Sequence, residues 1–453
     1  MTRQPAPDER PVTLSIAGSD SGGGAGIQAD CKTMAACGAF PTSIITAVTA
    51  QNTQGVASTH VLPTAEIAAQ LAAITDDFEI TAVKTGMLAS EPVIDLVADF
   101  AATFDGPIVV DPVMVATSGD RLLEPAAVEA YDRLFEHATL ITPNTDEAAV
   151  LTDTEPMNAT DARSVAADLR DHGAENVLLT GGHLPTEDVI DVLATSENTS
   201  TLSHPRVATA ATHGTGCMLS SAITARLAHG ESIDRAIDSA SDLVGRAIRY
   251  HHDVGGGPGA VHHLVGLRET AHRQPLQETV TEIVQTLTEI GVRELVPEVG
   301  MNVVGATPFA ETTTEIAAVE GRITKTIDGI HPNRGVRFGA SSHMARFLLA
   351  MRECDPTVRF AINCRHTDAI KQAVKALSGP IAAYDRADEP TAKKENATMG
   401  WGARMAYESV SDTPVAVLDD GAHGKEPIIK LLAEGPETLV ERVRTVEGAL
   451  DEQ

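Results

Sequence analysis

Short apolar runs alternate with longer amphipathic segments from Val12 to about His263. This alternation is typical of β-α-β units, because each buried strand of a parallel sheet is joined to the next by a crossover helix. Strands are predicted at residues 12–18, 44–50, 81–88, 107–114, 139–143 and 176–183. The pattern predicts a doubly wound α/β domain in the first part of the chain.

The length of 453 residues exceeds what one hydrophobic core usually supports, so two domains are expected. A glycine cluster followed by a polar run at residues 255–275 marks the boundary between them. We place it near residue 268, which gives domains 1–267 and 268–453. The second part opens with a helix that stops at Gly291 and then alternates strands with helices, which predicts a second, smaller α/β domain.

The charge balance limits the partners of the chain. Asp and Glu number 63 against 34 Lys and Arg, which gives a formal net charge of -29. Nucleic-acid phosphates are bound by basic surfaces, so no nucleic-acid partner is expected. The acidic residues predict either an ordinary solvated surface or adaptation to high salt, in which screening reduces self-repulsion.

The sequence shows neither a recognisable targeting segment nor a cysteine motif. Residues 1–11 lack the apolar core of a secretory signal, and no uninterrupted apolar run reaches about 18 residues, so a cytoplasmic protein without a membrane partner is expected. The 5 cysteines are an odd number without CxxC spacing, which predicts neither a disulfide framework nor a zinc site.

Residues 17–33 form a predicted strand that ends in a glycine-rich turn and opens a helix. Glycine lets a ligand approach the backbone closely, so Gly18 is a candidate substrate-binding residue. The segment fits neither GxGxxG nor GxxxxGK[ST], and a purely structural turn stays open as an alternative. Asp30 and Gln51 flank apolar elements, where they can hydrogen-bond the edge of a heteroaromatic ring or simply be solvated.

A small-residue loop leads into an amphipathic helix at THGTGCMLSSAITARLA, residues 212–228. The backbone N–H groups of Gly214, Thr215 and Gly216, with the helix dipole, are predicted to bind phosphoryl oxygens. Cys217 lies in the first helical turn, where the pKa of its thiol is expected to fall towards neutrality, so that it can accept a proton. A buried structural cysteine is the alternative.

Polar residues also follow two predicted strands. Asp111 stands at the carboxyl end of one strand, where open α/β sheets bind their ligands, and Asn144 and Glu147 follow the next with the spacing NxxE. Such oxygen ligands suit Mg²⁺, which keeps several waters and bridges phosphates. Each residue taken alone can instead be a helix cap or a turn residue.

Seven segments in chain order resemble the motifs of the hydroxymethylpyrimidine/phosphomethylpyrimidine kinases of thiamine synthesis, which are ribokinase-like: AGSDSGGGAGIQAD, TAVTAQNTQGV, KTGML, DPVMVATSGD, ITPNTDEA, GGH and THGTGC. The resemblance covers residues 12 to about 265. It implies transfer of the γ-phosphoryl group of ATP, with Mg²⁺, to 4-amino-5-hydroxymethyl-2-methylpyrimidine (HMP) and its monophosphate. It also implies residue roles: Asp30, Gln51 and Met87 contact the pyrimidine, Asn144 and Glu147 organise Mg²⁺ and phosphate, and Cys217 replaces the aspartate base of related sugar kinases.

One departure from this family concerns the residue before GGH, which is often lysine and here is Thr180. Phosphate charge must then be met by arginine, metal ions or the amides of Gly214 to Gly216, which bears on the second phosphorylation more than on the first. Pyridoxal kinase activity is the nearest alternative, although AQNT and HGTGC favour the pyrimidine. Ribokinase-like domains commonly dimerise, so the resemblance also implies a homodimer.

The second part contains another helix start rich in small and polar residues. Ser341, Ser342 and His343 place hydroxyls and an imidazole beside free N–H groups, which predicts a second phosphate cradle. Three cations elsewhere in this part can pair with phosphate oxygens: Arg322, Arg337 and Lys425. Each can equally be a surface residue, and Ser341 can be no more than an N-cap.

Six segments of this part are similar to the thiamine-phosphate synthase domain of the ThiN type, over residues 278–448: PEVGMNVVGATP, VEGRI, FGASSHMAR, YDRADEP, TMGWGARMA and DDGAHGKEPIIKLL. The resemblance implies coupling of the pyrimidine diphosphate with thiazole phosphate to give thiamine phosphate and pyrophosphate. Arg322 and His343 are the residues expected to act, together with Mg²⁺, on the leaving group. Because the same domain senses ligands in some transcription regulators, a non-catalytic domain that senses thiamine phosphate is the alternative.

Overall fold

The structure is a computed structural model that describes residues 8–114, 127–386, 398–422 and 426–452, together with Gln4 and Ala6. The chain divides into two compact units, Met1–Gly266 and Leu267–Gln453, which we call the first and the second unit. None of the described helices combines the length and the apolarity needed to cross a bilayer.

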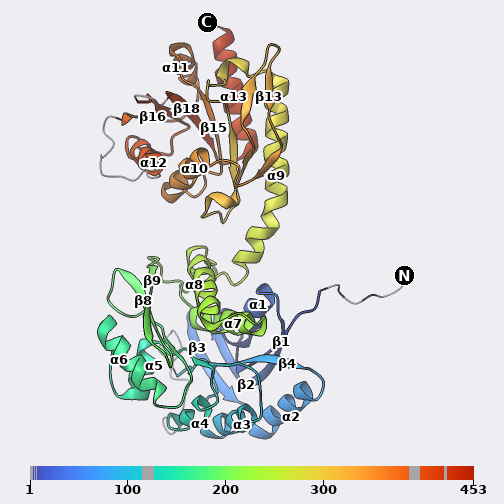
Figure 1. Ribbon diagram of the computed structural model, residues 1–453, viewed down its shortest axis with the longest axis vertical. Helices are drawn as coiled ribbons and strands as arrows, with labels where there is room; N and C mark the ends of the chain where they lie inside the picture. The colour runs from blue at the N-terminus through green and yellow to red at the C-terminus, as the bar shows by residue number, and fades with distance from the viewer. Residues whose placement is uncertain are drawn as a thin grey trace. The chain divides into compact units, whose positions relative to one another are not determined.

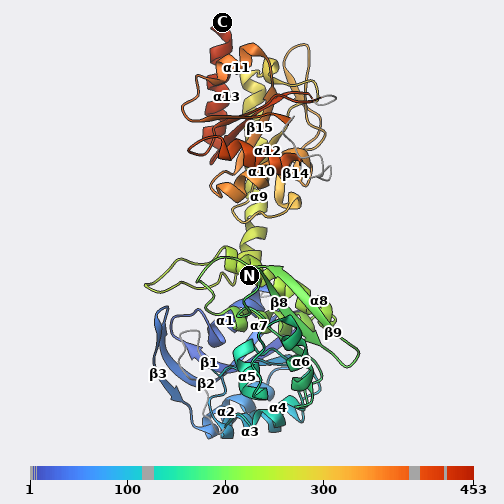
Figure 2. The same ribbon diagram turned by 90° about the vertical axis from the view of Figure 1, so that its left-hand side faces the viewer.

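A nine-stranded sheet forms the centre of the first unit in the described part of the chain (Figures 1 and 2). Its strands are β1 (Val12–Asp20), β2 (Phe40–Asn52), β3 (Gly55–Val61), β4 (Ile80–Thr85), β5 (Ile108–Val110), β6 (Leu140–Ile141), β7 (Val177–Leu179), β8 (Asp188–Ala194) and β9 (Thr199–Pro205). They lie in the order β3-β2-β1-β4-β5-β6-β7-β8-β9. The strands from β2 to β7 in this order are parallel, and β3, β8 and β9 pair antiparallel at the edges.

Helices cover both faces of this sheet. Its helices are α1 (Gly26–Ala36), α2 (Thr64–Thr75), α3 (Glu91–Ala101), α4 (Tyr131–Phe135), α5 (Thr145–Thr152), α6 (Ala159–Arg170), α7 (Thr215–Ala228) and α8 (Ile233–Arg249). One hydrophobic core joins the central strands to α2 through α6, whereas α1, α7 and α8 pack together on the other face. This confirms the predicted ribokinase-like α/β fold. All six predicted strands are present, because runs such as those of β5 and β7 are buried on both sides.

The edge strands β3 and β9 and the neighbouring strand β8 were not predicted. Most residues of β3 and β9 are exposed or half-exposed and polar, so the strands lack the apolar run that marks a central strand. Their pairing with β2 and with each other comes from the fold around them.

The second unit is built on a seven-stranded sheet in the order β14-β11-β10-β15-β18-β17-β16. Its strands are β10 (Val303–Ala306), β11 (Ile316–Val319), β14 (Val336–Phe338), β15 (Phe360–Arg365), β16 (Ile381–Tyr384), β17 (Ala416–Asp419) and β18 (Ile428–Ala433), and a separate hairpin pairs β12 (Ile323–Lys325) with β13 (Ile330–Pro332). Among the described strands of this sheet, β16 and β17 pair in parallel and the other pairs are antiparallel.

Helices again cover both faces of the second sheet. The helices are α9 (Val265–Ile290), α10 (His343–Cys354), α11 (Asp368–Val374), α12 (Thr398–Glu408) and α13 (Pro436–Asp451). One core lies between the sheet and α9, α11 and α13, and a second lies between the sheet and α10 and α12. The second, smaller domain with helices and strands is therefore present, as predicted, but its sheet is mainly antiparallel.

Candidate functional site

Two glycine-containing loops pack against each other in the first unit. Residues 21–25 join β1 to α1, and residues 212–214 precede α7. A Cβ atom on Gly214 would lie 1.9 Å from the carbonyl oxygen of Gly24, and Gly214 has a left-handed φ of 86°. Only glycine satisfies both conditions without strain, so the two motifs that the sequence singled out are in direct contact.

Asp20 and His213 link these loops. The Asp20 carboxylate accepts three backbone N–H groups of residues 22–25 at 2.7 to 2.8 Å, and its Oδ2 lies 3.2 Å from Nε2 of His213. Burial alone would raise the pKa of Asp20, but the hydrogen bonds from His213 and the loop outweigh it and lower the pKa. Neither residue was predicted as a site residue.

Three predicted substrate residues lie around the carboxyl ends of neighbouring strands. A Cβ atom on Gly18 would lie 3.2 Å from the sulfur of Met87, so the two residues form one wall. The half-buried Gln51, near the end of β2, places its Nε2 3.4 Å from Nε2 of His213. The carboxyl edge of a parallel sheet is where ligands bind in this class of fold.

Asp30 does not take the position predicted for a substrate-binding residue. It is fully buried on α1, and both its oxygens lie 2.9 Å from Nζ of Lys84. It also accepts hydrogen bonds from Ser15 at 2.6 Å and Ser221 at 2.8 Å. With its carboxylate engaged by three side chains, Asp30 joins α1, β1, β4 and α7 beneath the loops instead of presenting an edge to a ligand.

The pKa of the Cys217 thiol is raised, whereas the sequence predicted that it would be lowered. Cys217 lies in the first turn of α7 as expected, but burial raises the pKa of its thiol to about 12, against the opposing effects of Lys84 and of the Gly26 N–H. Desolvation of the thiolate therefore outweighs the helix dipole on which the prediction relied. In this conformation the thiol is protonated at neutral pH.

The phosphate-binding loop is only partly free. The N–H of Thr215 donates to the carbonyl oxygen of Thr212 at 3.1 Å, and its hydroxyl donates to the same oxygen at 2.6 Å. Thr215 is therefore engaged within its own loop. Gly214 is the N-cap of α7 and Gly216 its second residue, so the positive end of the helix dipole is directed at this place.

Asp111 and Glu147 are buried carboxylates near the same edge. Asp111 accepts a hydrogen bond from Ser220 of α7 at 3.2 Å, and burial raises its pKa to about 6. Burial, and then the charge of Asp111, raise the pKa of Glu147 as well. Asn144 is the N-cap of α5, because its side chain accepts the N–H groups of Asp146 and Glu147 and the side chain of Glu147 accepts its own N–H. The cap interpretation is confirmed for Asn144 and Glu147.

Of the three residues predicted to bind Mg²⁺, two fit this role in the structure, Asp111 and Glu147. The charge of Asp111 raises the pKa of the buried Glu147, so the two ionised carboxylates repel one another, and a cation relieves that repulsion. Mg²⁺ in phosphoryl-transfer sites is held by one or two carboxylates, waters and substrate phosphates, which suits Asp111 and Glu147. The side-chain oxygen of Asn144 already accepts two N–H groups and is not a suitable ligand.

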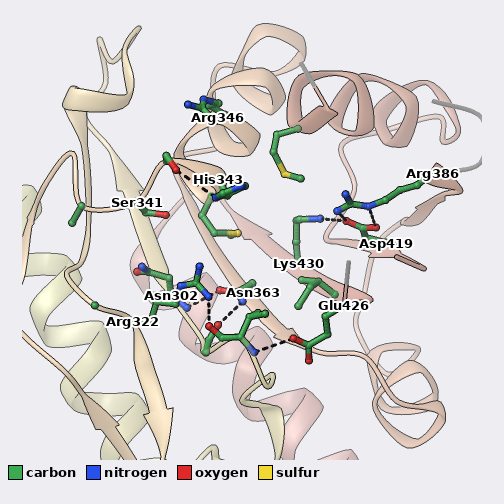
Figure 3. A pocket seen from close by; sticks show the side chains of 18 residues that line it. Asn302, Arg322, Ser341, His343, Arg346, Asn363, Arg386, Asp419, Glu426 and Lys430 are labelled. Carbon is green, nitrogen blue, oxygen red and sulfur yellow. Dashed lines mark hydrogen bonds and ion pairs between the residues drawn. The ribbon is translucent and has the colours of Figure 1, made fainter. Parts of the chain in front are cut away.

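A cavity of about 520 Å³ opens in the second unit (Figure 3). Four of the residues predicted from the sequence line it. Arg322 directly precedes β12, and Ser341, Ser342 and His343 lie at the start of α10. Ser342 is the N-cap of α10 and makes no side-chain capping hydrogen bond, so the N-cap interpretation of Ser341 is wrong. Arg322 has a left-handed φ of 67° and donates from Nη1 to the carbonyl oxygen of Val299.

Arg337 is not among the described residues that line this cavity. Arg337 is 64% exposed and pairs with Glu320 at 2.8 Å, so the surface interpretation holds for it and the phosphate-binding prediction is wrong in this conformation. Lys425 lies outside the described residues.

The sequence analysis missed a buried cluster on the floor of the cavity. Asp419, at the end of β17, is fully buried and forms ion pairs with Arg386 at 2.6 Å and Lys430 at 3.0 Å. The hydroxyl of Tyr384 donates to the same carboxylate at 2.6 Å. Although burial raises the pKa of Asp419, these donors outweigh it and hold the pKa well below its usual range. Arg346 also lines the cavity, from α10.

One signal in the sequence pointed to such residues. Lys84 and Lys430 each interrupt an apolar strand, in TAVKT and IIKLLA. A lysine that is buried with a strand must be paired, because an isolated buried charge is costly. The signal indicates a partner but does not say which one.

Comparison with known proteins identifies a family for each of the two units. The family model described as phosphomethylpyrimidine kinase matches residues 20–262, and the model described as thiamine-phosphate synthase ThiN matches residues 279–445. The chain belongs to the phosphomethylpyrimidine kinase family. It carries a ThiN-type domain behind its kinase domain, which confirms the resemblances seen in the motifs.

Individual relatives match the kinase domain. The hydroxymethylpyrimidine/phosphomethylpyrimidine kinase of Streptomyces coelicolor is 45% identical over 270 residues, which are 59% of this chain and 100% of that protein. The thiamine biosynthesis bifunctional protein ThiED of Geobacter sulfurreducens is 42% identical over 59% of this chain but only 55% of its own length. Among solved structures, a pyridoxal kinase of Bacillus subtilis in complex with ADP is 35% identical, with a TM-score of 0.53 over 56% of this chain and 98% of that chain.

Proposed function

We propose that this protein catalyses consecutive steps of thiamine synthesis. The first unit transfers the γ-phosphoryl group of ATP to HMP and then to its monophosphate, and the second unit couples the resulting diphosphate with thiazole phosphate. The products are thiamine phosphate and pyrophosphate. The 45% identity to a hydroxymethylpyrimidine/phosphomethylpyrimidine kinase over that protein's whole length supports the first step, and the ThiN match supports the second.

The observation that carries the kinase proposal is the convergence at the start of α7. Cys217, Ser220 and Ser221 lie at positions i, i+3 and i+4 of this helix, hence on one face, and the two serines contact Asp111 and Asp30. These contacts fix the helix start, and with it Cys217, over the carboxyl edge of the sheet. In-line phosphoryl transfer depends mainly on such positioning.

The state of Cys217 constrains the proton transfer. A protonated thiol cannot accept the proton of the substrate hydroxymethyl group, so Cys217 acts as a base only after its own proton has left. Lys84, buried beneath it, favours the thiolate, while burial opposes it.

Mg²⁺ would be held by Asp111 and Glu147 and would neutralise charge on the transferred phosphate. The positive end of the α7 dipole stabilises the same negative charge on the phosphate. The N–H of Thr180 donates to the carbonyl oxygen of Pro143, and Thr180 forms a β-bridge with Asn144. Because threonine carries no positive charge, the second phosphorylation depends on Mg²⁺ and on the start of α7.

In the second unit, loss of pyrophosphate from the pyrimidine methylene carbon needs cations at the leaving group. Arg322 and His343 line the cavity beside the start of α10, where helix N–H groups are directed at the same place. This arrangement supports catalysis more than mere sensing, since it concentrates positive charge where negative charge develops.

The test is turnover by the purified chain. HMP, ATP, Mg²⁺ and thiazole phosphate are supplied in high-KCl buffer, and pyrimidine phosphates and thiamine phosphate are separated by chromatography. We expect thiamine phosphate from the wild type. Cys217→Ala should abolish synthesis from HMP but not from supplied pyrimidine diphosphate. Arg322→Ala should still convert HMP to the diphosphate but should make thiamine phosphate neither from HMP nor from supplied diphosphate, so that each variant controls for the other.

Other outcomes assign the alternatives. Accumulation of the diphosphate without thiamine phosphate, together with tight binding of thiamine phosphate, would make the second unit a sensor. Faster phosphorylation of pyridoxal than of HMP would favour a pyridoxal kinase, which the likeness to the Bacillus subtilis enzyme keeps as the second candidate. Cytoplasmic location, a homodimer, the absence of nucleic-acid and membrane partners, and adaptation to high salt stay predictions.

A further inference from the structure

The carboxylate of Asp419 is completely engaged by cationic and hydroxyl donors on the cavity floor. Arg386 donates to its two oxygens at 2.7 and 2.6 Å, Tyr384 at 2.6 Å, Lys430 at 3.0 Å and the N–H of Gly421 at 3.1 Å. A carboxylate offers about four acceptor sites, so Asp419 is left with none for a metal ion or a substrate. Its role is to hold Arg386 and Lys430 in place.

Lys430 presents its ammonium group from the centre of β18. The side chain is 96% buried, and its Nζ lies 3.2 Å from the Tyr384 hydroxyl and 4.7 Å from the centre of the Phe347 ring. Within the described residues Asp419 and Tyr384 use two of its three N–H groups, and Lys430 lines the cavity. Burial lowers the pKa of Lys430 despite the charge of Asp419, so a further anion would be favourable here.

Basic side chains from different elements line the cavity on two sides, and the Glu426 carboxylate lines it as well (Figure 3). At one end Arg322 and His343 stand beside the N-terminus of α10, and both side chains are exposed. At the other end Arg386, two residues after β16, and Lys430, on β18, are nearly buried. A cavity of about 520 Å³ is large enough for drug-sized ligands and can hold two anionic groups apart.

We propose that Arg386 and Lys430, positioned by Asp419, bind the phosphate monoester of the thiazole substrate, while the Arg322 end of the cavity binds the diphosphate. This inference rests on the proposed synthase function, which requires both anions in one site at once. The assignment follows from exposure. Pyrophosphate has to leave after the bond is made, which suits the open end, whereas the monoester stays attached to the product and suits the buried end.

Lys430→Met tests the proposal in the full-length protein, because methionine keeps the bulk of the side chain and removes its charge. We expect the KM for thiazole phosphate to rise at least about tenfold, since a hydrogen bond to a charged group contributes that much or more. The KM for the pyrimidine diphosphate should stay within about twofold. The preference for thiazole phosphate over the unphosphorylated thiazole alcohol should fall by the same factor as the affinity.

The matched control is Lys375→Met, which removes an exposed positive charge from the same unit outside this cavity and should leave both KM values unchanged. Asp419→Asn should act like Lys430→Met, because both cations lose their anchor. Equal increases of the two KM values, or a fall in kcat alone, would overturn the proposal, since a general structural defect affects both substrates.

A measurement on the wild type decides the matter if the variants do not fold. Thiazole phosphate is titrated into the protein by calorimetry with and without saturating pyrophosphate. Simultaneous binding supports two separate anion sites; displacement of one by the other, or no binding of thiazole phosphate, contradicts them. Failure of the wild type to make thiamine phosphate would instead count against the proposed function, and this titration would still report on the two sites.

Discussion

Lys84→Met should destabilise the first unit by about 3 to 5 kcal/mol, the cost of leaving one member of a buried ion pair unpaired. Lys84 and Asp30 are both fully buried, with Nζ 2.9 Å from each carboxylate oxygen. Within the described residues, the substitution leaves the Asp30 carboxylate with the hydroxyl groups of Ser15 and Ser221 as its side-chain hydrogen-bond donors. For a unit of this size, roughly 2 to 4 °C per kcal/mol predicts a fall in Tm of about 6 to 20 °C.

Scanning calorimetry of the full chain measures this shift. Trp401 is the single tryptophan and lies in the second unit, so its fluorescence follows the unfolding of that unit separately and should not change. Lys32→Met is the matched control, because Lys32 is exposed and donates only to a backbone carbonyl in the same unit. We expect this control to cost less than about 1 kcal/mol.

The double variant Lys84→Met with Asp30→Asn provides the decisive comparison. It removes both charges, so it should be more stable than Lys84→Met alone by at least about 1 kcal/mol. A fall in Tm below about 2 °C for Lys84→Met, or a double variant whose loss equals the sum of the two single losses, would refute the reasoning that an unpaired buried carboxylate is the cause.

Three further results are expected. Because burial raises the pKa of the Cys217 thiol to about 12, its alkylation by iodoacetamide, followed by mass spectrometry, should keep accelerating from pH 7 to 10 without a plateau; a plateau near pH 7 would contradict the burial argument. Mg²⁺ should raise the Tm of the first unit at pH 8 and lose this effect by pH 5. The folded pKa of Asp111 is raised to about 6, so below that pH protons occupy the carboxylates instead, and Asp111→Asn or Glu147→Gln should weaken the effect at pH 8. Arg322→Ala should slow thiamine phosphate synthesis at least about a hundredfold, whereas the rate of Arg337→Ala should stay within about twofold of the wild type in the same chromatographic assay. Equal losses of rate would show that Arg337 contributes to the site as well.

The sequence predicted the elements of the first unit better than the environment of their side chains. Buried parallel strands such as β5 and β7 are recognisable by their continuous apolar runs. The glycine loops were recognisable too, but the contact between Gly24 and Gly214 was not predicted. The capping box of Asn144 and Glu147 was also visible, because it is local. Edge strands such as β9 were missed, since most of their residues are polar and their pairing depends on a neighbour.

The sequence placed candidate residues correctly where their position depends on local backbone geometry. Ser342 and His343 lie at the start of α10 beside the cavity, as a helix-start motif implies. The prediction was wrong where it depended on a distant partner: Arg337 pairs with Glu320 on the surface, whereas Arg386 and Lys430 meet at Asp419 inside the cavity.

The sequence by itself determined the alternation of strands and helices, the positions of the glycine loops and the order of the motifs, because these depend on residues close together in the chain. Only the tertiary structure decided which charges are buried and paired. Asp30 and Lys84 are 54 residues apart, and Ser221 is 191 residues from Asp30, yet all three meet beneath Cys217. Burial and pairing set the cost of a charge, so the protonation of Cys217 and the true place of Asp30 follow from packing between distant segments.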